Sequence, residues 1–187
     1  MPFLSEADRR AALQLARTAV VEAIAHRKLP DVFPREGIFA ERRSVFVTLH
    51  VRNRLQGCIG VIEANEPLGE AIIHCAASAA LEDPRFAPMR TDQLAELNIE
   101  ISLLSPMEQI APESIEIGHH GLFVRLHAQR GLLLPQVAIE HRLTREQFLE
   151  ETCRKAGLPR EAWRDPEARL FGFTCEILSE SSHHERA

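Results

Sequence analysis

Hydrophobic residues recur at two different spacings along this chain of 187 residues. Spacings of three and four place side chains on one face of a helix and predict three longer helices. The first follows a cap at Ser5 and runs to about His26. The second has Asn65 as its predicted N-cap and Pro67 in its first turn. The third begins at the capping-box sequence of residues 144–147.

Strict alternation of hydrophobic and polar residues predicts β-strands instead. Residues 44–51 and the run that starts at Leu55 form a predicted hairpin, because Asn53 between them tolerates positive φ. Four more extended segments are predicted, at residues 99–104, 115–126 (with a turn inside), 130–137 and 170–178. No strand–helix–strand series repeats, so the pattern favours an α+β fold with a mainly antiparallel sheet flanked by helices.

The second strand of the hairpin carries two glycines, Gly57 and Gly60, three positions apart. Glycine inside a strand is destabilising and usually marks a bulge or a place where something approaches the backbone closely. Cys58 lies between them with little side-chain cover. One interpretation makes Cys58 a nucleophile or covalent acceptor. The other makes it a buried cysteine, with both glycines present for packing.

Four further residues are candidates for a site, each with a structural alternative. His120, held on a turn, could accept a proton or simply hydrogen-bond within that turn. Arg85 could bind a carboxylate or phosphate, or pair with Asp83 two residues before it. Ser102 lies on the polar face of its strand, which faces either a cleft or solvent. Gln136, after Pro135, could bind a ligand or cap the strand end.

Composition excludes several classes of protein. Apolar content of 45% and charged content of 26% are those of an ordinary globular domain, and no segment is long and apolar enough for a membrane span. The charged N-terminal sequence is not that of a signal peptide, and four scattered cysteines without a CxxC pair predict reduced thiols in the cytoplasm. A net charge of −5 gives the chain no broad attraction for nucleic acid, so this partner is the weakest hypothesis, with Arg9-Arg10, Arg42-Arg43 and Arg52/Arg54 as the candidates for a local basic patch.

The sequence predicts no metal and no cofactor. His119-His120 and His183-His184 are adjacent pairs, and neighbouring residues do not project to one side of a regular element. No Ser-His-Asp order, HExxH pair, Walker sequence or dinucleotide fingerprint is present.

Several of these segments, in this order, resemble the AMMECR domain family, the protein A component of the bacterial AmmeMemoRadiSam gene cluster. The matching segments cover nearly the whole chain from the first helix onward: Leu55 to Gly60, Asp83 to Phe86, residues 99–104, 118–121, 131–137 and 148–158. One departure is Gln56, where the family motif normally has arginine.

The resemblance implies an α+β fold with a larger and a smaller lobe and with the motifs around a cleft. We therefore expect residues 1–187 to form a single AMMECR-like domain of one or two lobes, in which residues 181–187 are a loose tail. The resemblance also implies two partners, a Memo-type protein and a radical S-adenosylmethionine protein, and no established activity.

Two functions follow as hypotheses. In the first, the protein is an enzyme or enzyme subunit with Cys58 as nucleophile, His120 as proton acceptor and Arg85 as anion anchor. The remaining predicted binding residues are Gly57, Gly60, Ser102 and Gln136. In the second, the protein is a non-catalytic module that binds a ligand or another protein. The substrate is unknown in either case.

Overall fold

The computed structural model describes residues 4–180 and divides the chain into two compact units. Unit 1 contains the residues up to Leu103 together with those from Glu176 onward, and unit 2 is Leu104–Cys175. Each unit combines helices with a four-stranded sheet. The predicted tail, residues 181–187, lies outside the described residues.

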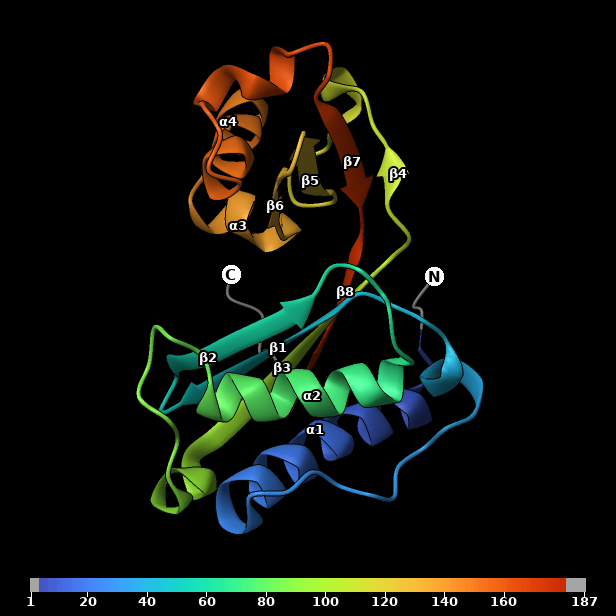
Figure 1. Cartoon of the computed structure of the whole chain (residues 1–187), viewed down its shortest axis with the longest axis vertical. Helices are drawn as coiled ribbons and strands as arrows, with labels where there is room; N and C mark the ends of the chain where they lie inside the picture. The colour runs from blue at the N-terminus through green and yellow to red at the C-terminus, as the bar shows by residue number, and fades with distance from the viewer. Residues whose placement is uncertain (1–3, 181–187) are drawn as a thin grey trace. The chain divides into compact units, whose positions relative to one another are not determined.

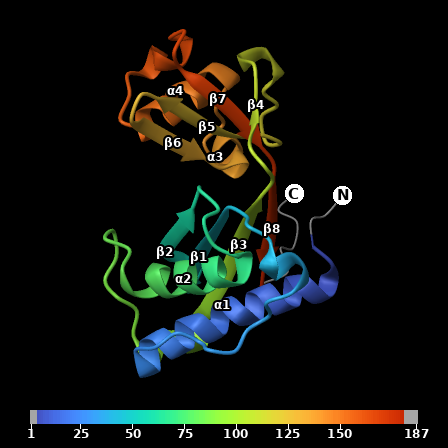
Figure 2. The same cartoon turned by 45° about the vertical axis from the view of Figure 1, so that its right-hand side comes forward.

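Unit 1 is a four-stranded sheet with two helices on one face (Figures 1 and 2). The helices are α1 (Glu6–His26) and α2 (Leu68–Leu81). The sheet has the order β2-β1-β3-β8 and contains β1 (Val45–Val51), β2 (Arg54–Val61), β3 (Leu97–Leu104) and β8 (Cys175–Ser179). β1 pairs antiparallel with both β2 and β3. β2 therefore stands at the edge of the sheet.

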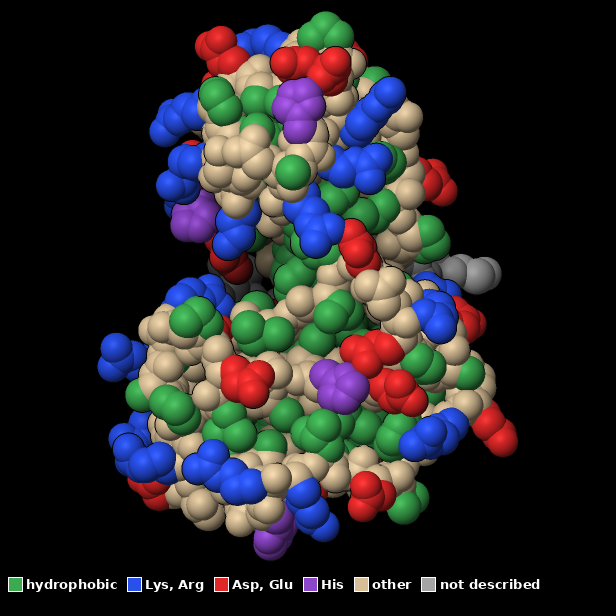
Figure 3. Space-filling model, viewed as in Figure 1, with side chains coloured by type: hydrophobic (Ala, Val, Ile, Leu, Met, Phe, Trp, Pro, Cys, Tyr) green, Lys and Arg blue, Asp and Glu red, His purple; other side chains and the backbone are tan. Residues whose placement is uncertain are grey.

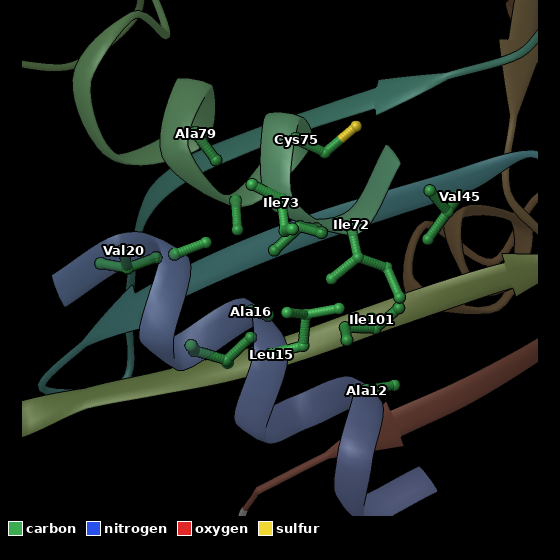
Figure 4. Packing of buried hydrophobic residues seen from close by; sticks show 14 of the residues in the cluster. Ala12, Leu15, Ala16, Val20, Val45, Ile72, Ile73, Cys75, Ala79 and Ile101 are labelled. Carbon is green, nitrogen blue, oxygen red and sulfur yellow. The ribbon is translucent and has the colours of Figure 1, made fainter. Parts of the chain in front are cut away.

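The core of unit 1 lies between this sheet and its helices (Figure 4). Alternate residues of β1 face the helices and are fully buried: Val45, Val47 and Leu49. The helices meet them largely through alanines, which let the backbones approach closely. Cys75 of α2 belongs to this core, with 2% of its surface exposed. On the side of unit 1 seen in Figure 3, acidic and basic side chains are interspersed.

Unit 2 is a smaller sheet of order β4-β7-β5-β6. Its strands are β4 (Glu108–Gln109), β5 (Gly121–Leu126), β6 (Gln129–Leu133) and β7 (Arg169–Phe173). Two helices follow β6 in the chain, α3 (Pro135–Glu140) and α4 (Arg145–Lys155). Leu122, Val124 and Leu126 of β5 are buried in one cluster with Phe148, Leu149 and Cys153 of α4. That cluster places α4 against one face of the sheet.

The structure confirms the α+β class and the antiparallel pairing, and it confirms both helix caps that use side chains. Ser5 Oγ accepts a hydrogen bond from the Asp8 N–H, and Thr144 and Gln147 form the complete capping box before α4. In the hairpin, Arg52 and Asn53 both have positive φ, as a tight two-residue turn requires.

Several predicted boundaries were wrong. The N-cap of α2 is Pro67 and not Asn65, because Pro67 is extended and bridges to Arg42. Residues 115–117 form no strand, because a turn from Glu116 to His120 takes up the backbone and Ile115 enters the core.

Two extended segments also proved to be composite. The segment 130–137 pairs only as far as Leu133, and Pro135 then opens α3. The segment 170–178 divides at Thr174 into β7 and β8, which belong to different sheets. The alternating pattern of the sequence continues through Thr174, so the pattern does not show that the strand divides there.

No described helix is both long enough and apolar enough to cross a bilayer.

Candidate functional site

The centre of the predicted site is β2, and its bulge is present. Leu49 of β1 pairs with Gly57 and His50 pairs with Leu55, so Gln56 has no partner on β1. The Gln56 side chain instead donates a hydrogen bond from Nε2 to the Ala87 carbonyl at 3.0 Å. This bond connects the bulge to the segment that follows α2.

Both glycines beside Cys58 are required by neighbouring parts of the chain. A Cβ atom on Gly57 would stand 2.0 Å from the carbonyl oxygen of Ala79 in α2. A Cβ on Gly60 would stand 2.2 Å from the ring of Phe46. What approaches the backbone at these positions is therefore helix α2 and an aromatic ring of the neighbouring strand.

The outer edge of β2 is hydrogen-bonded at Cys58 by two side chains rather than by a strand. The Cys58 N–H donates to Asp83 Oδ2 at 2.8 Å, and Arg85 Nη2 donates to the Cys58 carbonyl at 3.1 Å. An edge strand otherwise leaves such groups unpaired. The side chains of Asp83 and Arg85 thus bind the Cys58 backbone where the hydrogen bonds of a neighbouring strand would otherwise be.

Asp83 and Arg85 also bind each other in a two-point contact. Arg85 Nε lies 3.0 Å from Oδ1 and Nη2 lies 2.7 Å from Oδ2. The Asp83 side chain is 2% exposed and the Arg85 side chain is 53% exposed. Of the two predicted alternatives for Arg85, the structure therefore contains the pairing with Asp83, while Nη1 takes no part in these bonds.

This contact sets the electrostatics of the turn. The hydrogen bond from Arg85 holds the pKa of Asp83 well below its usual range, against the opposing effect of burial. The N–H groups of Cys58 and Arg85 lower the pKa further. Conversely, the carboxylate raises the pKa of Arg85. Asp83 is consequently a buried, ionised group whose bonds fix the backbone at Cys58.

The Cys58 thiol is on the face of the sheet opposite α1 and α2. Its cross-strand partner is Thr48, whose Oγ1 lies 3.3 Å from the sulfur and donates to it. Thr48 in turn pairs with Glu100 of β3. The three side chains form a row across three strands, and Cys58 is partly exposed.

Ser102 belongs to the next row on the same face, opposite Phe46. Its side chain is buried, with 1% of the residue exposed, and its hydroxyl has no hydrogen-bond partner among the described residues. Ser102 is therefore not part of a solvated strand face.

The other thiols differ from Cys58. Cys75 and Cys153 are buried, and burial raises the pKa of both, that of Cys75 to about 12. Cys175 is partly exposed, as Cys58 is. It is the matched reference for any test of thiol reactivity.

His120 and Gln136 belong to unit 2. His120 Nδ1 accepts a hydrogen bond from the Glu116 N–H at 3.0 Å, so we infer that the proton of the neutral ring is on Nε2. His120 also lines a hollow of about 310 Å³ together with Ser105, Phe173 and other residues of unit 2. Gln136 is the second residue of α3, and its buried Oε1 has no partner among the described residues.

The structure thus brings together Cys58, Gly57, Gly60 and Arg85, with Ser102 one row away. Sequence reasoning missed two contacts, Asp83 on the Cys58 N–H and Thr48 on the sulfur. The second could not be found from the hairpin turn alone, because a two-residue turn by itself places Cys58 opposite Val47, and the bulge at Gln56 moves it opposite Thr48. Within residues 4–180 no group of three or more His, Cys, Asp or Glu side chains is arranged to hold a metal ion.

Comparison with known proteins places this geometry in a family. Residues 13–178 match the sequence profile of AMMECR1. A protein of Methanothermobacter thermautotrophicus is 42% identical over 187 residues, covering 95% of this chain and 96% of its own length. A protein of Thermococcus kodakarensis is 41% identical over 182 residues, covering 90% of this chain and 88% of its own.

A solved structure agrees with these relationships. The crystal structure of an uncharacterized protein from Pyrococcus horikoshii superimposes with a TM-score of 0.81 and 39% sequence identity. The match covers 89% of this chain and 88% of the other. The chain is an α+β protein that belongs to the AMMECR1 family.

Proposed function

We propose that this AMMECR1-family protein is a cytoplasmic enzyme or enzyme subunit in which the Cys58 thiol forms a transient covalent bond with its substrate. The observation that carries the proposal is a partly exposed thiol whose backbone is held by two side chains and whose sulfur is held by a third. Asp83 binds its N–H, Arg85 binds its carbonyl, and Thr48 donates to its sulfur. Such fixed geometry is what a positioned nucleophile requires.

In the proposed step, Cys58 Sγ forms a bond to an electrophilic carbon of the substrate. The bond from that carbon to its leaving group breaks, and the thiol proton passes to the leaving group. Arg85 serves as an anion anchor, which is supported by its half-exposed side chain and by the freedom of Nη1 from the contact with Asp83. The roles predicted for His120 and Gln136 stay predictions, and this proposal rests on residues of unit 1 alone.

Alkylation with iodoacetamide at several pH values, mapped by mass spectrometry, tests the nucleophile. We expect Cys58 to react faster than Cys175, although both are partly exposed, and Cys75 and Cys153 to stay unmodified in the folded protein. A rate for Cys58 equal to that of Cys175 would remove the nucleophile role, because exposure alone would then explain it.

A second candidate, a non-catalytic binding module, is favoured by a different observation. The Cys58 N–H, which could have stabilised a developing negative charge, already donates to Asp83. In this proposal Cys58 fills space and the partners are the Memo-type and radical S-adenosylmethionine proteins. Pull-down with both, comparing wild type with Cys58→Ser and Cys175→Ser, separates the candidates. Binding and cellular function that survive Cys58→Ser favour the module, whereas binding without function favours the enzyme.

A further inference from the structure

Three arginines, two from one hairpin and one from a later strand, lie in one row on the sheet of unit 2. Arg125 of β5 lies directly opposite Arg130 of β6 on one side and Arg169 of β7 on the other. All three are exposed. They are on the face opposite the core, because the alternate residues Val124 and Leu126 are buried with α4. Neighbouring strands are about 4.8 Å apart, so the row spans about 10 Å.

Such a row is unfavourable for folding. Like charges directly opposite each other destabilise a sheet. The screening length at physiological salt, about 8 Å, exceeds the distance between neighbouring strands. The repulsion between Arg125 and its two neighbours is therefore only partly screened.

Acidic residues outnumber basic ones in the chain, yet two of the three arginines in the row, Arg125 and Arg169, have no acidic partner among the described residues. The chain has 27 Asp and Glu against 22 Lys and Arg. Three other arginines of unit 2 do have carboxylate partners, in the pairs Arg154–Glu151, Arg160–Glu150 and Arg164–Glu146. Within the described part of the chain, the side chains of Arg125 and Arg169 form no ion pair. The fold thus concentrates positive charge here.

The neighbouring row on this face limits what can bind. It consists of Leu132, Phe123 and Phe171, of which Leu132 and Phe123 are each only 8% exposed. Single-stranded nucleic acid needs a longer groove and exposed aromatic rings on which bases stack. A single row of three guanidinium groups, one from each of three strands, suits a shorter ligand.

We propose that Arg125, Arg130 and Arg169 bind a short chain of phosphate groups, as in inorganic triphosphate or a nucleoside triphosphate. Each guanidinium group can donate two parallel hydrogen bonds to phosphate oxygens, and the strand spacing presents the groups in a line. The bound anion removes the repulsion within the row. This inference concerns different residues from the proposed function and does not depend on it.

Calorimetric titration of the full-length protein with sodium tripolyphosphate, and separately with ATP without magnesium, tests the site. We expect Arg125→Gln to weaken tripolyphosphate binding about tenfold, since it removes charge-assisted hydrogen bonds at the centre of the row. Arg169→Gln should act in the same direction. The matched control is Arg145→Gln, which removes the same charge from α4 on the other face of the sheet, and it should change binding less than about twofold.

Two outcomes support the site and distinguish inorganic triphosphate from a nucleoside triphosphate, and three others would contradict the proposal. Equal affinities for tripolyphosphate and ATP mean that the phosphate chain alone is recognised, and tighter ATP binding means that the nucleoside also makes contact; both support the site. Three results overturn it: no tripolyphosphate binding at about 0.15 M salt, equal losses in Arg125→Gln and Arg145→Gln, or tighter binding of a single-stranded oligonucleotide with the same dependence on Arg125. The Tm of Arg125→Gln should equal or exceed that of wild type, which shows that lost binding is not lost folding.

Discussion

In unit 1, helix α2 crosses β2 at Gly57, and in unit 2 the residue after α4, Ala156, meets β6 at Gly131. A Cβ on Gly57 would stand 2.0 Å from a backbone oxygen, and one on Gly131 would stand 2.5 Å from the backbone nitrogen of Ala156. In both units, therefore, a glycine in the sheet lets the helical segment pack directly against the strand backbone.

The faces opposite these helices differ. In unit 1 that face carries the row Cys58, Thr48 and Glu100, and in unit 2 it carries the row Arg130, Arg125 and Arg169. The glycines thus determine how the helices pack, and the rows on the opposite faces contain the residues proposed to react or to bind a ligand. Changes at the two kinds of position should accordingly have separable effects, on stability in one case and on reactivity or binding in the other.

Gly57→Ala should have the largest effect on stability. Its new methyl group would clash with the backbone of helix α2, which cannot move away as a side chain can. We therefore expect a loss of about 3 kcal/mol in the free energy of unfolding, measured by urea denaturation. Gly131→Ala should cost nearly as much in unit 2, for the same reason. Gly60→Ala is the control: its methyl group meets the ring of Phe46, a half-buried side chain that can shift, and should cost about 1 kcal/mol. Equal losses at Gly57 and Gly60 would show that the helix contact is not what requires Gly57.

Asp83→Asn should have the next largest effect. It removes the charge that binds Arg85 and weakens the bond from the Cys58 N–H, at a side chain that is 2% exposed. We expect a loss of about 2 kcal/mol in the free energy of unfolding and faster hydrogen exchange of the Cys58 amide. Asp92→Asn is a close control, because Asp92 binds Arg90 with the same two-residue spacing and the same two-point geometry.

The Arg90–Asp92 pair is exposed on both sides, at 73% and 65% of the side-chain surface. Its removal should therefore not change stability measurably. If Asp92→Asn destabilised the protein as much as Asp83→Asn, burial and the Cys58 bond would not be the source of the effect.

Acid should weaken unit 1 through the same carboxylate. The pKa of Asp83 is lower in the folded state than its unfolded value of about 3.9, so its contribution to stability is fully present above that pH. The contribution is lost as the pH falls below about 4 toward the folded pKa. Urea denaturation between neutral pH and about pH 3 should show a steeper loss in wild type than in Asp83→Asn. Parallel curves would contradict an ionised Asp83 in the folded protein.

The fold could be predicted from the sequence wherever the signal is local. The caps at Ser5 and Thr144 and the hairpin turn at Asn53 were predicted because each depends on residues within four positions of one another. The strand predicted at 115–117 was wrong because Ile115 is buried by tertiary packing rather than by pleating. The single strand predicted at 170–178 was wrong because nothing in an alternating pattern tells which of two sheets a residue joins.

The candidate sites show the same limit. The glycines around Cys58 were visible in the sequence, but the contact between Asp83 and the Cys58 N–H joins residues 25 positions apart. The arginine row depends wholly on strand register. Arg125, Arg130 and Arg169 do not stand in basic clusters in the sequence, unlike the adjacent pairs Arg9-Arg10 and Arg42-Arg43. A negative net charge consequently did not reveal a local concentration of positive charge.

The smallest expected effect is a gain in stability when an arginine of the row in unit 2 is replaced. No such gain is expected in the row of unit 1 that contains Cys58. Arg125 has an arginine on both sides, whereas Arg169 faces one within the row. Replacing Arg125 with glutamine should therefore raise the free energy of unfolding by a few tenths of a kcal/mol, roughly 0.5, and Arg169→Gln should raise it by less. In unit 1, Thr48→Val, which removes a hydroxyl from the neutral partner of Cys58, should give no such gain. Urea denaturation at low salt and at about 1 M salt measures the difference, because screening at high salt should abolish the gain of the arginine variants. A gain that persists at high salt would mean that relief of charge repulsion is not its cause, and the row would then be no more strained than its counterpart in unit 1.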